Sequence, residues 1–394
     1  MKLKFLPLKS ILPFVLIFFS FYSCNNRKSD SRVVLDRDYK DEIIAGRDAL
    51  RLYLITGAPG ASVSVSIDGK TVWSEGMGYA NKELHVPARP ETKYRIGRSS
   101  EVFATMLVAK LQEEGKVNVD SSFYTYVPNY PKKQWDFTLR NLGNHTAGFP
   151  QTSNDIVYNK ENYKTLKEYV HASADDSLAF PPNNYYAISD YGTCLLGILA
   201  ETVEGKSYPI LVKEMLLDTM GLNETVADNP VFVIPDRSAT YTTNYIAQVA
   251  NAPGIDSRFV APAYGYLSTA DDLNKLGQMI MNKEFFTEET YNLILTPNNL
   301  KTGYHTNIGF GWSIFNDKKG NKVYILQGNT IGGTSFLAVF PDKKLVISLC
   351  SNMADNSDGL PSTQIVNLFL NKLDPEKPKS EVSTKETEAE QKQK

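Results

Sequence analysis

The chain of 394 residues has little cysteine and little histidine, which limits the chemistry available to it. These residues are Cys24, Cys194, Cys350, His85, His145, His171 and His305. No cysteine has metal-ligand neighbours at a useful spacing, so we expect neither a metal site nor a cofactor. The histidines fit no serine, histidine and acid pattern. Cys194 and Cys350 lie in apolar segments, so we expect both to be buried, and a disulfide between them stays open.

The chain also lacks a charge excess. Its 42 Lys and Arg residues nearly balance its 44 Asp and Glu residues, which gives a formal net charge of -2. Nothing in this balance indicates the basic surface that nucleic acid requires, so nucleic acid is not an expected partner. A hydrophobic content of 42% is sufficient for a substantial core. Small molecules and peptides are therefore the expected ligands.

Long apolar runs are scarce, and the one from residue 11 to 21 is too short to span a membrane. Three lysines precede it, which predicts a secretory signal over residues 1–23. Cys24 follows the small residue Ser23 and resembles the lipidated cysteine of a bacterial lipoprotein box. We therefore expect export across the inner membrane and a lipid anchor in the cell envelope, periplasmic or at the surface. A plain signal peptide with an incidental cysteine is the alternative.

Composition divides the remaining chain into three parts. Residues 24–37 are mostly polar and are predicted to be a lipidated tether. Residues 374–394 are almost all Glu, Lys, Ser, Thr, Gln and Pro, which predicts a disordered charged tail. The folded domain is therefore expected at 38–373, and it contains no internal repeat.

Strand patterns occur near both ends of this domain, and helical patterns lie between them. Residues 39–55 have helical character, and residues 61–67 alternate small or polar with apolar side chains, as a half-buried strand does. Asp68-Gly69 predicts a hairpin turn after that strand. A second hairpin is predicted from strands at 335–340 and 345–349. A helix is expected at 102–114, with Gly115 ending it.

Five segments together resemble one protein family. They are residues 58–63, 113–120, 138–149, 264–273 and 308–312. The chain is similar to the β-lactamase-related serine hydrolases, which include class C β-lactamases, D-alanyl-D-alanine carboxypeptidases and related esterases. The resemblance implies an α/β (α+β) transpeptidase fold, with an antiparallel sheet built from both termini, flanking helices and a helical lobe. His145 resembles the structural histidine of that family.

The family's nucleophile motif, S-x-x-K, is altered here. In that motif a serine at a helix start attacks a carbonyl, and a lysine one turn later assists its deprotonation. Aligning Gly97 and Phe103 places Arg98 at the serine and Glu101 at the lysine. A shift of one residue does not restore the motif, because neither Ser99 nor Ser100 has a lysine three positions on. The covalent route is therefore lost at this position, since a protonated arginine cannot attack a carbonyl.

The second motif, Tyr-Ser-Asn or Tyr-Ser-Asp, aligns with Ile188, Ser189 and Asp190. Its tyrosine moves a proton in the family, and an isoleucine cannot do so. Tyr186 lies two residues earlier, at a different position of the motif. We expect no replacement of the missing group by Tyr186.

The third motif, K-T-G or H-x-G, aligns with residues 327–329, where Gln327 replaces the histidine and Asn329 replaces the glycine. The sequence Lys-Thr-Gly does occur at 301–303. It precedes the segment at 308–312, where the family has a loop, so we interpret it as a turn.

Three functional hypotheses follow from these substitutions. In the first, the protein is a catalytically inactive pseudoenzyme, and Arg98 holds a small carboxylate such as the C-terminus of a cell-wall peptide. Gln327 and Asn329 would contact that ligand from the opposite wall. Arg98 also lies at the positive end of a helix, which costs about 0.3 to 1 kcal/mol and which Glu101 could offset.

The alternatives keep the same cleft but change its role. One is an active serine hydrolase with relocated groups, in which Ser99 or Ser100 is the nucleophile and Glu101 or Asp190 the base. Such a pair is poorly matched in pKa unless burial raises that of the carboxylate. Serine also caps helix starts, which favours a structural role for both serines. The other alternative is a vestigial cleft filled by an Arg98–Glu101 pair.

Overall fold

The structure is a computed structural model that describes residues 32–151, 161–246, 248–354 and 359–374. The predicted signal peptide, Cys24 and the tail from residue 375 lie outside the described residues. Those that are described belong to one compact unit, which begins at Arg32. Within these ranges no helix combines the length and the apolar character needed to cross a membrane.

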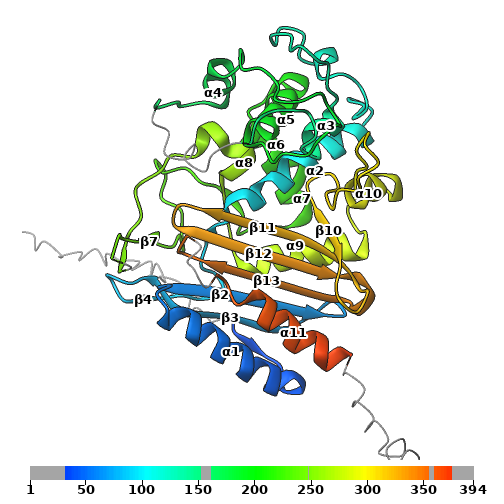
Figure 1. Cartoon of the computed structure of the whole chain (residues 1–394). Coiled ribbons are helices and arrows are strands. Elements are labelled where there is room, and N and C mark those ends of the chain that lie inside the picture. The colour runs from blue at the N-terminus through cyan, green and yellow to red at the C-terminus, as the bar shows by residue number, and fades with distance from the viewer. Residues whose placement is uncertain (1–31, 152–160, 247, 355–358, 375–394) are drawn as a thin grey trace, which may run out of the picture. The chain divides into compact units, whose positions relative to one another are not determined.

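Most of the long strands lie near the two ends of the described chain, and most of the helices lie between them (Figure 1). The strands are β1 Val34–Leu35, β2 Gly60–Ile67, β3 Lys70–Asn81, β4 Val86–Pro87, β5 Tyr94–Arg95, β6 Val226–Ala227, β7 Tyr241–Thr243, β8 Val249–Asn251, β9 Tyr266–Ser268, β10 Ser313–Asn316, β11 Lys322–Thr330, β12 Gly333–Phe340 and β13 Leu345–Ser351. The helices are α1 Lys40–Ile55, α2 Glu101–Glu113, α3 Leu139–Gly143, α4 Leu166–Ala172, α5 Asp190–Glu204, α6 Tyr208–Val212, α7 Asp218–Met220, α8 Ala261–Tyr264, α9 Ala270–Asn282, α10 Glu288–Leu295 and α11 Ser362–Leu373. Short 3-10 turns include η2, Gly97–Ser100, which leads into α2.

The main sheet joins the two ends of the domain, as the sequence predicts. Its antiparallel order is β1-β3-β2-β13-β12-β11-β10, and β4 pairs with β3. Both predicted hairpins are present, as β2–β3 and β12–β13. The domain begins earlier than the predicted residue 38, because Val34 and Leu35 pair with Ser74 and Trp73 at the sheet edge. Residues 34 and 35, which the sequence analysis assigned to the tether, therefore belong to the folded domain.

Helices cover both faces of this sheet (Figure 1). On one face α1 and α11 pack together, and Phe369 stacks on Trp73 with ring centroids 6.3 Å apart. On the other face α9 packs on β2, β12 and β13. The prediction of a half-buried β2 is wrong, because all eight of its residues are buried. Two of its serines bond to α9: the Ser66 hydroxyl donates to Asn274 Oδ1 at 2.6 Å, and the Ser64 carbonyl accepts from Asn274 Nδ2 at 3.0 Å.

The helical lobe is built around α2, whose bounds match the predicted helix to within one residue. Ten of its thirteen residues are buried, so the helix is enclosed on nearly all sides. Gly115, at a φ of +69°, follows its last turn. All members of both hydrophobic clusters come from residues 39–373, so we expect the domain to fold without the segments outside it.

The two described cysteines are buried free thiols. Cys194 lies in α5 and Cys350 in β13. Burial raises the pKa of both thiols, which keeps them protonated and unreactive. The disulfide that the sequence left open is therefore not formed.

Candidate functional site

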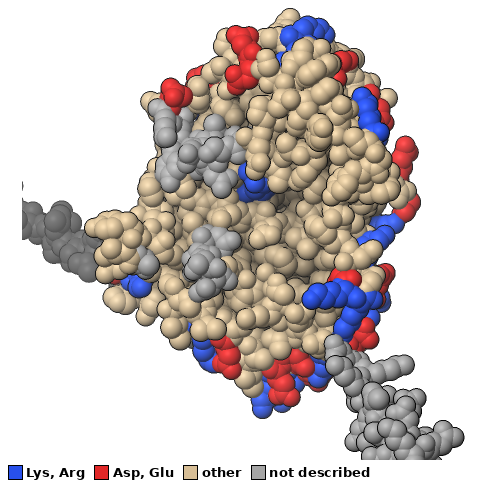
Figure 2. Space-filling view, viewed as in Figure 1, with Lys and Arg blue, Asp and Glu red and all other residues tan. Residues whose placement is uncertain are grey.

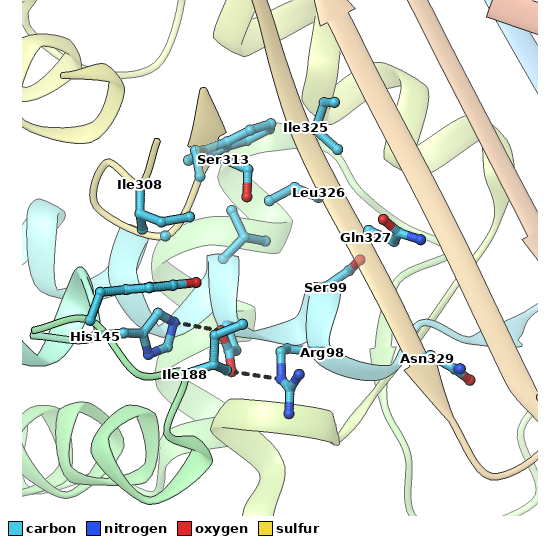
Figure 3. Close-up of a pocket in the computed structure, with 15 residues that line it drawn as sticks. Arg98, Ser99, His145, Ile188, Ile308, Ser313, Ile325, Leu326, Gln327 and Asn329 are labelled. Carbon is cyan, nitrogen blue, oxygen red and sulfur yellow. Dashed lines mark hydrogen bonds and ion pairs between the residues drawn. The ribbon is translucent and has the colours of Figure 1, made fainter. Parts of the chain in front are cut away.

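A cleft of about 340 Å³ opens where η2 and the start of α2 meet strand β11. Figure 2 shows a hollow on this side of the molecule, with basic atoms beside it and few charged residues around it. The lining residues are Arg98, Ser99, Glu101, Val102, His145, Tyr186, Ile188, Ile308, Gly311, Trp312, Ser313, Ile325, Leu326, Gln327 and Asn329. Figure 3 shows that polar and apolar side chains both line the cleft: Ile188 lies beside Arg98, and Ser313 lies near Ile325.

The structure brings most of the predicted site residues together. Arg98, Ser99, Glu101, Ile188, Gln327 and Asn329 all line the cleft. Ser100, Ser189 and Asp190 do not, and each is almost completely buried. The three altered motifs thus converge on one cavity, although the first and the third are more than 200 residues apart in the chain.

Arg98 is held by Asp190, at the first position of helix α5. Its Nε donates to Asp190 Oδ1 at 3.1 Å, and its Nη2 lies 3.0 Å from the same oxygen. Nη2 also donates to the hydroxyl of Tyr264 at 2.7 Å, and that hydroxyl donates to Asp190 Oδ2 at 2.9 Å. The guanidinium that was predicted to hold a ligand carboxylate is thus bonded to groups within the protein.

Glu101 connects Arg98 to His145 on the other side (Figure 3). Glu101 Oε1 lies 3.5 Å from Arg98 Nε, and Oε2 lies 3.2 Å from His145 Nε2. The backbone N–H of Ser189 donates to His145 Nδ1 at 3.4 Å. Because Nδ1 accepts, the neutral imidazole carries its proton on Nε2 and donates it to Glu101. Both ring nitrogens of His145 are therefore used in internal bonds.

Burial and neighbouring charges have opposite effects on the pKa values of Asp190 and Arg98. Burial raises the pKa of Asp190 to about 6, even though Arg98 favours its ionised form. Burial also disfavours the cation of Arg98, but Asp190 and Glu101 outweigh it and raise the pKa of Arg98. Arg98 is thus the cation that faces both carboxyl groups. Its attraction to them offsets the unfavourable position of a cation at a helix start.

The serines near Arg98 have structural bonds. The hydroxyl of Ser335 donates to the carbonyl of Ile96 at 2.8 Å, so the Ser99 hydroxyl, 2.8 Å away, donates to Ser335. Ser100 Oγ accepts from the backbone N–H of Tyr266 at 3.3 Å. Ser189 caps α5 by accepting from the N–H of Gly192. Each of these three hydroxyls is therefore engaged in a structural bond within the fold.

Two further segments were considered in the sequence analysis, and the structure places one in the cleft and the other outside it. Tyr186 lines the cleft and lies edge-on to His145, with ring centroids 6.2 Å apart. Burial raises the pKa of Tyr186 to about 12, so its phenol stays protonated near neutral pH. Residues 301–303 form an exposed turn that does not line the cleft.

Sequence reasoning missed one member of the network and one of its contacts. Tyr264 lies in the segment at 264–273 that contributes to the resemblance, but nothing in the sequence indicates that it bonds Arg98 and Asp190. The pairing of Arg98 with Asp190 was also missed, although both residues were predicted to be in the site. Within the described residues, no group of His, Cys, Asp and Glu side chains is arranged to hold a metal ion.

The fold and the cleft define a protein of the β-lactamase and penicillin-binding type. Residues 41–367 match the β-lactamase family, and the chain belongs to that family. Two solved structures support the fold. The octameric penicillin-binding protein homologue from Pyrococcus abyssi has a TM-score of 0.73 and 24% identity, over 84% of this chain and 77% of that one. A class C β-lactamase has a TM-score of 0.72 and 21% identity, over 86% and 98%.

Curated relatives are similar over part of their length. The human mitochondrial serine beta-lactamase-like protein LACTB is 28% identical over 315 residues, covering 62% of this chain and 57% of the relative. Protein flp of Staphylococcus aureus is 26% identical over 326 residues, covering 78% and 63%. The match thus spans less than two thirds of either relative.

Proposed function

We propose that this protein is a pseudoenzyme of the β-lactamase family that binds a cell-wall peptide in its cleft without cleaving it. The observation that supports this proposal is the Arg98–Asp190 contact at the position of the family's nucleophile. We further propose that a lipid on Cys24 attaches the protein to a membrane of the cell envelope.

The alternative, an active serine hydrolase with relocated groups, depends on Ser99, because Ser100 does not line the cleft. Ser99 is 4% exposed and donates its proton to another hydroxyl. A hydroxyl partner does not activate a nucleophile as a general base does. The geometry therefore favours binding over hydrolysis.

Strand β11 offers a more suitable recognition surface than Arg98. Pairing of β11 with β10 ends at Ile325, and β11 continues to Thr330 along the cleft. An extended peptide can add to such a strand by backbone hydrogen bonds. The exposed amide of Gln327 lies there as a donor and an acceptor. A carboxylate on Arg98, by contrast, would have to compete with Asp190.

The protein is expected to form no covalent adduct with a penicillin or with a fluorophosphonate serine probe. Both reagents require an activated nucleophile, and Arg98 supplies none. Intact-protein mass spectrometry on residues 25–394 measures the added mass, and circular dichroism verifies the fold. An adduct mapped to Ser99 or Ser100 would establish the relocated hydrolase instead.

A synthetic cell-wall peptide ending in D-alanyl-D-alanine is expected to bind reversibly. Replacing Gln327 by alanine should weaken binding about fivefold, which corresponds to one lost hydrogen bond of about 1 kcal/mol. Gln151→Ala, an exposed glutamine outside the cleft, is the matched control.

A second comparison tests whether Arg98 binds the carboxylate of the ligand. Titration calorimetry measures the affinity of the peptide with a free C-terminal carboxylate and of the same peptide with a C-terminal amide. Similar affinities support recognition by β11, whereas loss of binding by the amide would return the carboxylate contact to Arg98.

A further inference from the structure

Two loops that do not line the cleft project large apolar side chains into solvent. In the first loop, residues 229–235, Val231 is 69% exposed, Phe232 68% and Val233 96%. Prolines 230 and 235 flank these side chains. Three consecutive large apolar residues with this exposure are unusual for a soluble surface and indicate an interaction site.

The second loop is the tip of the hairpin formed by β7 and β8. There Tyr245 is 97% exposed and Ile246 is 57% exposed. Neither residues 229–235 nor residues 244–246 include a charged side chain. In Figure 2 the projection at the left, where Figure 1 places β7, is formed mainly of uncharged residues. We call the five exposed side chains of the two loops the apolar tips.

The first loop lies close to the N-terminal end of the described chain. Arg32 Nη2 is 4.0 Å from Glu224 Oε1, and Glu224 Oε2 is 2.6 Å from Lys93 Nζ. The backbone N–H of Lys93 donates to the carbonyl of Asp236 at 2.8 Å, one residue beyond the loop. A short series of contacts thus connects Arg32 with the foot of residues 229–235.

The predicted lipidation site places this side of the protein near a bilayer. Cys24 is eight residues before Arg32. Eight extended residues span at most about 29 Å, so a lipid on Cys24 would hold Arg32 within that distance of the membrane surface. This step depends on the proposed lipidation, whereas the exposure of the apolar tips does not.

We propose that the apolar tips insert into the interfacial region of a lipid bilayer and orient the domain on the membrane. Separate projecting tips suit a lipid surface, which accepts isolated apolar side chains, better than a flat protein interface with its polar rim. Phe232 and Tyr245 are aromatic, and Tyr245 has the amphipathic ring typical of membrane interfaces. Since the tips lack charge, insertion depends on apolar burial.

The test uses residues 25–394, which lack Cys24 and contain the complete core, with phosphatidylcholine vesicles in a flotation assay. The protein is expected to float with the vesicles, and 0.5 M salt should not release it. The double variant Phe232→Asp, Tyr245→Asp should reduce the bound fraction at least tenfold. Tyr304→Asp, at a residue 67% exposed outside the tips, is the matched control and should bind as the unmodified protein does.

Each other outcome overturns the proposal. Absence of flotation, or flotation equal in the double variant, would show that the tips do not insert. Sedimentation that reveals self-association, lost in the double variant and without flotation, would assign the tips to a second copy of the chain. Lipidation is measured separately, from the mass of the mature N-terminus of the exported full chain. Failure of lipidation and failure of insertion are therefore distinguishable.

Discussion

Replacing Arg98 by alanine is expected to lower the free energy of unfolding by about 3 kcal/mol at pH 8. The substitution leaves Asp190, which has no solvent exposure, without its cation. Removing one partner of a buried ion pair costs about 3 to 5 kcal/mol, and we expect the lower end because the Arg98 side chain is 24% exposed. Urea denaturation measures the change.

At pH 5 the Arg98→Ala substitution should lower the free energy of unfolding by only about 1 kcal/mol, which is roughly the value of the lost hydrogen bond to Tyr264. The folded-state pKa of Asp190 is raised to about 6, above its usual 3.8, so folding takes up a proton between these values. Asp190 thus lowers stability as the pH rises from about 4 to 6. Without Arg98 the pKa of Asp190 rises further. In the variant, the free energy of unfolding therefore continues to fall at pH values above 6. Near pH 5 the carboxyl is mostly protonated in both proteins.

Two variants control this experiment. Arg51→Ala removes an exposed arginine that pairs with Asp48 on the surface, and should change stability by less than about 0.5 kcal/mol. Arg98→Ala combined with Asp190→Asn should recover most of the loss at pH 8, because a neutral amide needs no cation. An equal loss at pH 5 and pH 8 would contradict the assignment to Asp190.

The sequence predicts the fold well where a pattern extends over several residues. The apolar spacing of α2 and the turns of both hairpins identify their elements closely. A strand as short as β1 has no detectable period, so its pairing with β3 cannot be anticipated. Ser64 and Ser66 of β2 look solvent-facing in the sequence because they contact α9, which begins about 200 residues later.

The site was predictable in its positions but not in its bonds. Alignment to the family motifs places Arg98, Glu101, Ile188 and Gln327 at one cavity, as the structure shows. It does not indicate that Asp190 lies below that cavity and bonds Arg98, because the contact spans 92 residues and depends on the packing of α5 beside α2. The ligand proposed from sequence relied on a free Arg98. Because Arg98 is bonded internally, the proposed peptide contact is with β11 instead.

The position of η2 against β11 depends on Gly328, and Gly328→Ala is expected to lower the free energy of unfolding by about 3 kcal/mol. A Cβ there would overlap the carbonyl oxygen of Ile96 and lie 2.7 Å from the backbone nitrogen of Ser99. Both are backbone atoms, so no side chain can rotate away and the two elements must separate. Urea denaturation measures this cost.

Separation of η2 from β11 would also change the cleft, since Arg98 and Ser99 belong to η2 and Gln327 to β11. Peptide binding should therefore weaken more than tenfold in Gly328→Ala. Gly254→Ala is the matched control, because a Cβ at Gly254 has no atom within 4 Å, and both its stability and its affinity should be unchanged. Stability unchanged in Gly328→Ala would show that β11 can move without cost. If only stability fell, the peptide would not use the wall that η2 and β11 form together.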